Sequence, residues 1–138
     1  MRKYFFITGC CLLSSLFIHA QTTDYRVVFD VTSKDSMDHK AVIRWLNEIS
    51  NPHPDARLEV VFYALSLGMI TKDKSVVAPD IAKLMNNKNI SFKVCAIAMQ
   101  NQHVDKSQLL PGVEIVPDGI YEIISKQREG WGYIKAKL

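Results

Sequence analysis

Cysteine is scarce in this chain of 138 residues, which has three. Cys10 and Cys11 fall within the first twenty residues, a segment that we predict to be removed on export. Cys95 is then the single thiol of the mature protein, and one cysteine cannot form an intramolecular disulfide. Disulfide bonds are therefore excluded as a source of stability, and Cys95 is buried, reactive or paired between chains.

Long hydrophobic runs are also lacking, apart from one near the amino terminus. It spans residues 5–18, about fourteen residues, which is shorter than the roughly twenty needed to cross a bilayer. The charged Met1-Arg2-Lys3 precedes it and the small Ala20 follows it, as in a secretory signal peptide. We therefore predict that residues 1–20 are cleaved and that the protein is exported, to the periplasm of a two-membrane bacterium or otherwise to the medium. An uncleaved membrane anchor is the weaker alternative.

An excess of charge of one sign is missing too. Without Arg2 and Lys3, the 17 basic residues fall to 15, against 14 acidic ones. A nearly neutral chain lacks the charge of a nucleic-acid-binding protein, so we expect no nucleic-acid partner and, after cleavage, no membrane partner. The G-x-S-x-G motif and the glycine loops that bind phosphates or dinucleotides are also absent. Hydrolases, nucleotide enzymes and dehydrogenases are therefore without support.

Histidine is present, but in no compact metal motif. His39, His53 and His103 are far apart in the sequence, and His53 lies in a proline-rich loop. Together with Cys95, their spacings match no zinc-binding pattern. We expect neither a metal ion nor an organic cofactor.

What the chain does have is a regular alternation of strands and amphipathic helices. Runs of β-branched and aromatic residues predict strands at 26–31, 58–65, 90–95, 113–116 and 131–135. The first two are apolar almost throughout, as expected of parallel strands covered on both faces. Apolar residues at helical spacing predict helices that begin near Ser36, Pro79 and Asp118, with one more turn after Asp105.

This order predicts a single α/β domain over residues 21–138, which is too short to be divided in two. We expect a small, doubly wound, mostly parallel five-stranded sheet with helices on both faces. In such sheets, ligands bind beyond the carboxyl ends of the strands. Cys95 ends the third strand, and its side chain should point away from the face shared by Ile90, Phe92 and Val94.

The helix expected over residues 96–102 bears on the chemistry of Cys95. Its unsatisfied N–H groups and the positive end of its dipole would favour the thiolate, the reactive form of the side chain. Burial among apolar side chains would instead disfavour the thiolate and make Cys95 a core residue. Lys93 lies on the same face as the thiol, and Thr32 and Ser33 follow the first strand. These three residues are candidates for the rim of a binding pocket.

Segments of the chain resemble the DsrE/DsrF-like family, which includes the sulfur-relay subunits of tRNA thiolation and of dissimilatory sulfur oxidation. Residues 89–99, NISFKVCAIAM, are similar to the strand, cysteine and helix start that hold the family's sulfur-carrying thiol. Residues 109–119 and 127–134 are similar to the closing segment of many single-domain members. With the order of strands and helices, the resemblance covers residues 24–138.

The resemblance implies that Cys95 is a catalytic thiol, which accepts sulfur as a persulfide and passes it to a cysteine of a partner protein. It also implies assembly into trimers or hexamers, and no cofactor. Many members have a histidine and several glycines in the loop after the second strand, whereas this loop reads Ala64-Leu-Ser-Leu-Gly68. Ser66 and Gly68 are therefore the candidate rim residues of this loop.

Two functions remain open at this point. The first is an exported sulfur carrier with persulfide-relay activity at Cys95. The second is a non-catalytic oligomeric module that binds a small ligand or a protein, with Cys95 as a structural residue. The accessibility of the thiol distinguishes them, because a carrier must expose its sulfur to donor and acceptor.

Overall fold

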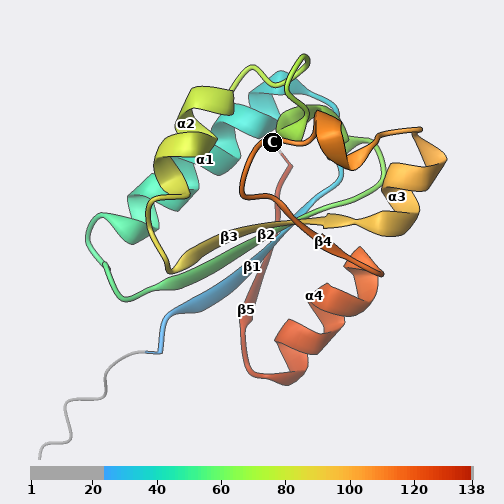
Figure 1. The fold of residues 1–138 in the computed structure, drawn as a ribbon. Coiled ribbons are helices and arrows are strands. Elements are labelled where there is room, and N and C mark those ends of the chain that lie inside the picture. Colours follow the sequence, from blue (N-terminus) through green and yellow to red (C-terminus); the bar gives the residue numbers. More distant parts are fainter. Residues whose placement is uncertain (1–23, 138) are drawn as a thin grey trace, which may run out of the picture.

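The computed structural model describes residues 24–137 and arranges them as one sheet of five parallel strands flanked by helices (Figure 1). The strands are β1 (Arg26–Val31), β2 (Arg57–Phe62), β3 (Ile90–Cys95), β4 (Glu114–Val116) and β5 (Gly132–Lys135). The helices are α1 (Ser36–Ser50), α2 (Ala78–Leu84), α3 (Ala96–Asn101) and α4 (Gly119–Arg128), with 3-10 turns η1 (Ser66–Ile70) and η2 (Lys106–Gln108). The predicted α/β class is confirmed. The predicted signal peptide, residues 1–20, lies outside the described residues.

The strand order β4-β3-β2-β1-β5 explains why helices lie on both faces. From β1 to β4 each strand is added on the same side of the previous one, and right-handed crossovers keep these connections on one face. α4 then leads back across the sheet to β5, beside β1, so its crossover lies on the opposite face. Figure 1 shows α1 and α2 above the sheet and α4 below it. The predicted doubly wound topology is confirmed.

The sheet face that α1 and α2 cover carries the main apolar core. Alternate residues of the three central strands point into it, and each is at most 6% exposed. They are Val27, Phe29 and Val31 of β1, Leu58, Val60 and Phe62 of β2, and Ile90, Phe92 and Val94 of β3. The rings of Phe62 and Phe92 stack with their centroids 6.3 Å apart. This face is the principal source of hydrophobic stability.

Side-chain caps fix where two of the helices begin. Asp118 caps α4, as predicted, by accepting hydrogen bonds from the backbone N–H groups of Ile120 and Tyr121. The cap of α1 is Asp35 rather than the predicted Ser36, because the Asp35 carboxylate accepts the N–H of Met37 at 2.8 Å. Ser36 is instead the first helical residue. Both helices therefore start where a carboxylate satisfies otherwise unpaired N–H groups.

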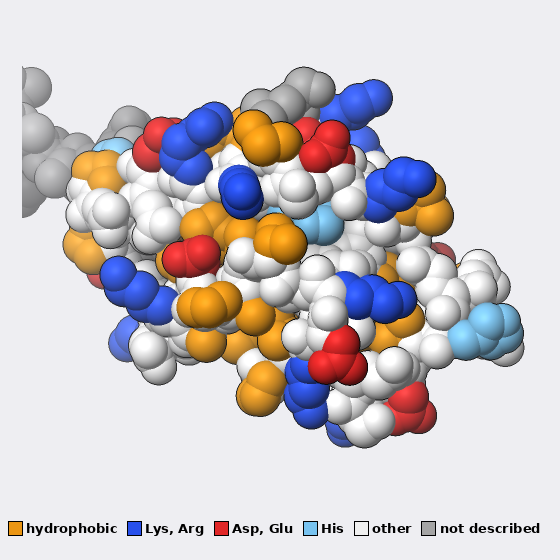
Figure 2. Space-filling model, turned by 90° about the horizontal axis from the view of Figure 1, so that it is seen from above, with side chains coloured by type: hydrophobic (Ala, Val, Ile, Leu, Met, Phe, Trp, Pro, Cys, Tyr) orange, Lys and Arg blue, Asp and Glu red, His pale blue; other side chains and the backbone are white. Residues whose placement is uncertain are grey.

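The surface of the molecule mixes side chains of different kinds. On the face seen from above in Figure 2, basic and acidic side chains are interspersed with hydrophobic ones, several of which gather near the middle. This face therefore carries no continuous field of one sign. Within residues 24–137, none of the helices combines the length and the apolar character needed to span a bilayer.

Candidate functional site

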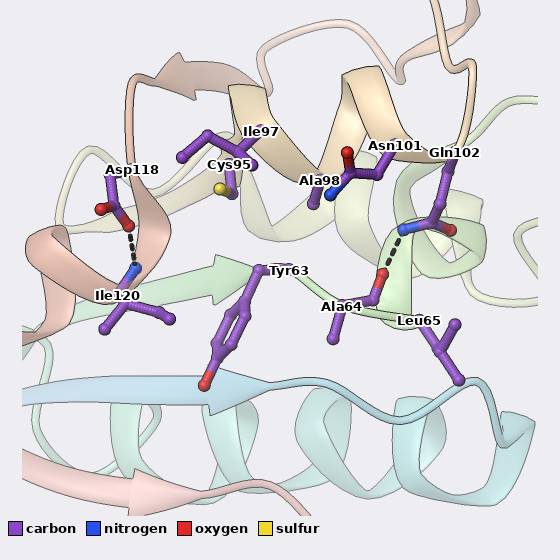
Figure 3. Close-up of a pocket in the computed structure, with 10 residues that line it drawn as sticks. All are labelled: Tyr63, Ala64, Leu65, Cys95, Ile97, Ala98, Asn101, Gln102, Asp118 and Ile120. Atoms are coloured by element: carbon purple, nitrogen blue, oxygen red, sulfur yellow. Dashed lines mark hydrogen bonds between the residues drawn. The ribbon is translucent and has the colours of Figure 1, made fainter.

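A cavity of about 460 Å³ opens at the carboxyl edge of the sheet. It lies between the ends of β2 and β3, α3 and the start of α4 (Figure 3). The connection after β3 runs on the α1 and α2 side, whereas the connection after β4 runs on the α4 side. This divergence is the topological switch point of the sheet, where open α/β proteins bind ligands. The cavity is lined by Tyr63, Ala64, Leu65, Cys95, Ile97, Ala98, Asn101, Gln102, Asp118 and Ile120.

Cys95 lies at the inner wall of this cavity. It is the last residue of β3 and the N-cap position of α3, with the extended backbone angles φ −70° and ψ 121°. The side chain is only 5% exposed, and the sequence expectation that it points away from the main core face agrees with its closeness to Gly119 of α4. At the strand end it also adjoins the larger apolar core. A reagent must therefore enter the cavity to reach the sulfur.

Gly119 allows α4 to begin directly against Cys95. A Cβ atom at this position would lie 3.0 Å from Cys95 Cβ, 3.3 Å from a methyl of Val61 and 3.6 Å from Tyr63 Cβ. Any side chain would push the helix away from the cysteine. The first turn of α4 is thereby held against the Cys95 side chain. The Asp118 carboxylate caps the same turn and lines the cavity.

The opposite wall of the cavity is the loop after β2, which the sequence interpretation missed. Residues 63–65 were predicted to continue the strand, but the strand ends at Phe62 because Ala64 turns the chain with a left-handed φ of +50°. Gln102, at the end of α3, donates a side-chain hydrogen bond to the carbonyl of Ala64 and holds the loop. A left-handed alanine is uncommon and costs free energy. Nothing in the residue types marks this turn.

The five rim candidates chosen from the sequence lie outside the lining of the cavity. Ser66 is fully buried, and its hydroxyl donates to the carbonyls of Val31 and Tyr63. The next candidate, Gly68, is part of the same 3-10 turn, η1. These two residues shape the loop rather than face a ligand.

Thr32 and Ser33 follow β1 at the same edge of the sheet but make local contacts. The Thr32 hydroxyl accepts a hydrogen bond from Lys135 Nζ at 2.8 Å, and the Ser33 hydroxyl accepts one from the N–H of Asp35 at 3.1 Å. Lys93 shares the α4 face with Cys95, as predicted. Its ammonium group, however, is paired with the carboxylates of Glu59 and Glu122. Alternation along β3 correctly predicted that Lys93 lies on the same face as Cys95, but it did not show that Lys93 lies outside the lining of the cavity.

A buried carboxylate, Asp30, sits beside the cavity on the α4 face. Its side chain is 7% exposed. Tyr133 donates to it at 2.6 Å, Tyr63 donates to it at 3.1 Å, and Lys135 Nζ lies 2.9 Å away. Burial, with the charge of Asp30, raises the pKa of Tyr63 to about 12, and the pKa of Tyr133 is also raised to about 12 by burial and by its hydrogen bond to Asp30. Tyr63 thus connects this cluster to the cavity.

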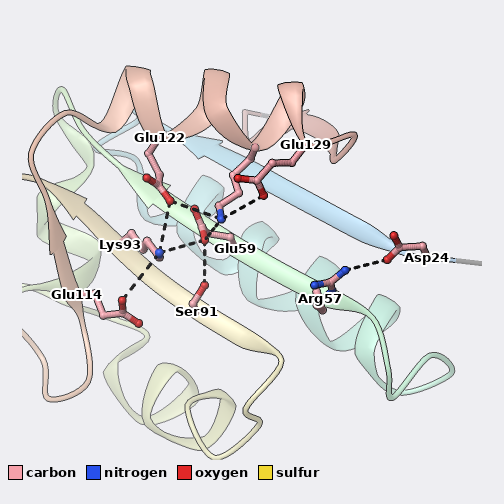
Figure 4. Close-up of polar contacts among 9 residues, drawn as sticks. Asp24, Arg57, Glu59, Ser91, Lys93, Glu114, Glu122 and Glu129 are labelled. Carbon is pink, nitrogen blue, oxygen red and sulfur yellow. Dashed lines mark hydrogen bonds and ion pairs between the residues drawn. The ribbon is translucent and has the colours of Figure 1, made fainter.

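A second polar cluster lies beneath the middle of α4 (Figure 4). Glu59 of β2 is 3% exposed and lies 3.4 Å from Lys93 Nζ and 3.7 Å from Lys126 Nζ. Both lysines also approach Glu122 of α4, at 3.4 and 3.8 Å. Burial, strengthened by a hydrogen bond with Glu122, raises the pKa of Glu59 to about 7, and Glu59 Oε1 has no hydrogen-bond partner. This arrangement suits a carboxyl group that holds a proton near neutral pH.

Neither cluster forms a recognisable metal centre. Among residues 24–137, no three histidine, cysteine or acidic side chains are grouped so that they could share a metal ion. The carboxylates of Asp30 and Glu59 are instead neutralised by lysines and hydroxyl groups. The lining of the cavity includes one thiol, that of Cys95.

Comparison with known families decides what kind of protein carries this cavity. The family model described as "DsrE/DsrF-like family" matches residues 26–136. The chain belongs to the DsrE/DsrF-like family. The match spans the whole sheet and includes Cys95, so the resemblance noted from residues 89–99, 109–119 and 127–134 is confirmed at the level of the family.

Solved structures place this family member among proteins of the same fold. A protein of unknown function, MTH1491 of Methanobacterium thermoautotrophicum, is 29% identical, with a TM-score of 0.76 over 81% of this chain and 99% of that one. The BT1422 protein of Bacteroides thetaiotaomicron is 14% identical, with a TM-score of 0.68 over 84% and 98%. The ychN protein of E. coli is 11% identical, with a TM-score of 0.67 over 81% and 98%. A search of curated proteins found no match.

Proposed function

We propose that this family member is a sulfur carrier, in which Cys95 accepts sulfur as a persulfide and passes it to a thiol of a partner. The observation that carries the proposal is the position of Cys95 at the inner wall of a cavity at the switch point of the sheet. Membership of a family that includes sulfur-relay subunits supports the same chemistry. The reaction would be a persulfide relay and needs no cofactor.

The chemical step requires a thiolate and a reachable sulfur atom. The Cys95 thiolate attacks the outer sulfur of a donor persulfide, a new sulfur–sulfur bond forms, and the donor thiolate leaves with the electron pair of the broken bond. Gly119 leaves room for the start of α4 to lie against Cys95. The cavity provides room for the added sulfur.

The test is a mass measurement on the mature protein incubated with a persulfide donor. We expect the wild type to gain the mass of one sulfur atom and a Cys95→Ser variant to gain none. Treatment with a reductant should remove the added sulfur. A wild type that stays unmodified, or a Cys95→Ser variant that gains as much, would contradict the proposal.

A second function is favoured by the burial of the thiol. Cys95 is 5% exposed and belongs to the main apolar core cluster. These features also suit a structural cysteine in a module that binds a small ligand or a protein. In that case Cys95→Ser would leave partner binding unchanged, and the native thiol would resist labelling until the protein is unfolded.

We also propose that the protein is exported and assembles as a homo-oligomer, a trimer or a hexamer. Assembly is supported by exposed apolar side chains on β4 and α4, namely Ile115, Ile120, Tyr121 and Ile124, which are 40–60% exposed. Light scattering should find more than one subunit per particle, and Ile124→Glu should reduce that number.

Amino-terminal sequencing of protein from the expressing cell should begin at Gln21; retention of Met1 would contradict export by cleavage.

A further inference from the structure

The charge of the cavity restricts what can approach Cys95. All ten lining residues are described, and none of them is a lysine, arginine or histidine. Five are aliphatic, two carry neutral amides, and the one acidic side chain among them is that of Asp118. At the mouth, Leu65, Ile97 and Ile120 are each 50–59% exposed.

Two lysines on the α4 face of the sheet are paired with carboxylates. Lys135 lies over the ring of Tyr63, but its Nζ is 2.9 Å from the Asp30 carboxylate and 2.8 Å from the Thr32 hydroxyl. Lys93 Nζ lies between Glu59 and Glu122, 3.4 Å from each. Neither cation is available to balance a negative charge that enters the cavity.

Resting on the proposed function, we infer that the sulfur donor of this site is an uncharged, apolar compound of low molecular mass, and that inorganic anions such as thiosulfate are excluded. An anion would lose hydration in an apolar cavity and would meet the Asp118 carboxylate with no cation in reach. An apolar donor would replace water against Leu65, Ile97 and Ile120, which is favourable. The volume of about 460 Å³ is that of a small-molecule site.

A dialkyl trisulfide illustrates this donor class. The Cys95 thiolate attacks the central sulfur atom, one sulfur–sulfur bond of the trisulfide breaks, and the alkyl thiolate leaves with the electron pair. Cys95 then carries the transferred sulfur with one alkylthio group attached to it. The released alkyl thiolate attacks the sulfur of that alkylthio group, a dialkyl disulfide forms and leaves, and Cys95 keeps the transferred sulfur as a persulfide. The step needs neither an oxidant nor a reductant.

The test uses methanethiosulfonate reagents, which differ in charge but modify thiols by the same reaction. Methyl methanethiosulfonate is neutral and (2-sulfonatoethyl) methanethiosulfonate is an anion; each forms a mixed disulfide and releases methanesulfinate. Rates are measured by intact mass on the mature protein, native and in denaturant. We expect the ratio of neutral to anionic rates to be about tenfold larger in the native protein, because repulsion by Asp118 acts only in the folded cavity.

The Asp118→Asn variant isolates the charge, because asparagine is also a good helix cap. It should raise the rate of the anionic reagent several-fold relative to that of the neutral reagent, and this ratio corrects for any change in the reactivity of the thiol itself. The matched control is Asp55→Asn, which removes an exposed carboxylate in the turn before β2, at the opposite edge of the sheet. This control should change neither rate.

Equal rate ratios in native and unfolded protein would overturn the inference, and so would a native thiol that the neutral reagent does not reach. A direct comparison of donors separates this inference from the proposed function. If Cys95 takes sulfur from thiosulfate as readily as from a dialkyl trisulfide, the carrier function stands and the inference fails. If the charge preference holds but no donor loads sulfur, the carrier function fails and the selectivity of the cavity stands.

Discussion

The two faces of the sheet are built from the same strands but differ in composition. The face under α1 and α2 is apolar along every central strand. On the opposite face, the buried apolar cluster comprises Val28, Val61 and Ile123, and between and around them lie the Asp30 and Glu59 clusters. The strand register places Asp30 beside Lys135 and Lys93 beside Glu114, so charged residues form rows across the sheet.

This difference shows which face of the sheet accommodates polar side chains. Among residues 24–137, α4 is the one helix on its face, and its ten residues leave the margins of that face near solvent. Lysine, tyrosine and glutamate side chains can cover such margins, since their apolar stems pack while their polar ends reach partners or water. The cavity and Cys95 lie at the carboxyl end of this more polar face. The face under α1 and α2 therefore supplies most of the buried core, whereas the cavity opens at the end of the other face.

The largest effect should come from truncating the apolar face. Phe62→Ala removes a fully buried ring that stacks on Phe92, and we expect a loss of about 3–5 kcal/mol in the free energy of unfolding. The neighbouring Val61→Ala, a fully buried residue on the α4 face, should cost about 2 kcal/mol. Denaturant unfolding measures both. Equal losses would remove the distinction between the faces.

A smaller loss should follow when a cation is removed from the α4 face. Lys93→Met leaves Glu59 and Glu122 with Lys126 alone, and we expect a cost of about 2–3 kcal/mol, because an uncompensated carboxylate stays buried. Adding Glu59→Gln should recover most of this cost, since the amide carries no charge. The double-mutant cycle gives the coupling between the two residues. Additive losses would show that Lys93 and Glu59 do not interact.

The pH dependence of stability should distinguish the faces more finely. Burial raises the pKa of Glu59 from 4.5 to about 7, so the folded protein holds a proton that the unfolded chain has released. The contribution of this bound proton to the free energy of unfolding is complete below pH 4.5 and is lost as the pH rises to about 7. Over this range the free energy of unfolding should fall by about 1–2 kcal/mol. Burial acts to raise the pKa of Glu122, but its hydrogen bond to Glu59 and the charge of Lys93 lower it. The stability that these contacts give is therefore lost as the pH falls below 4.5.

The Glu59→Gln variant tests this assignment. Its free energy of unfolding should be nearly constant between pH 4.5 and 7, whereas that of the wild type should fall. Asp55→Asn, an exposed substitution, should retain the wild-type slope. A slope unchanged by Glu59→Gln would assign the proton to another group.

The smallest effect concerns the Asp30 cluster. Tyr133→Phe removes one of two hydroxyls that bind Asp30, and we expect a loss of about 1 kcal/mol. Burial and then Asp30 raise the pKa of both tyrosines to about 12, so in Asp30→Asn both should ionise at lower pH, although burial remains. Ultraviolet titration of tyrosinate follows this directly. Unchanged titration curves would show that burial alone sets these pKa values.

Much of the fold could be predicted from the sequence because its signals are local. Strand-length apolar runs and helical spacing gave every strand and the position of α4, and Asp118 is a strong cap signal. The family resemblance of residues 89–99 pointed to Cys95, and alternation along β3 gave its face. Strand order was not predicted, because the pairing of β1 with β5 joins opposite ends of the described chain.

The candidate site was only partly predictable, because it depends on contacts between distant segments. Residues 63–65 read as a continuing strand, and only the left-handed Ala64 reveals the turn. Gly119 looked like an ordinary helix start, but its lack of a side chain allows contact with Cys95. Asp30, Glu59 and Lys93 were polar residues within strands that otherwise read as apolar. Because these polar residues fall on one face of the sheet, they were the signal in the sequence that this face is polar and the other apolar.

The long crossover through α4 has a consequence for how the protein acquires its site. Val27 of β1 pairs with Gly132 of β5, so a loop of most of the chain must close before this ladder forms. Contacts of such sequence separation slow folding. We expect β1 to β3 to associate early, with the thiol still open to solvent, and α4 to dock last. Pulsed alkylation during refolding should therefore find that Cys95 reacts faster before the slowest phase than after it, when reagents reach the thiol through the cavity alone.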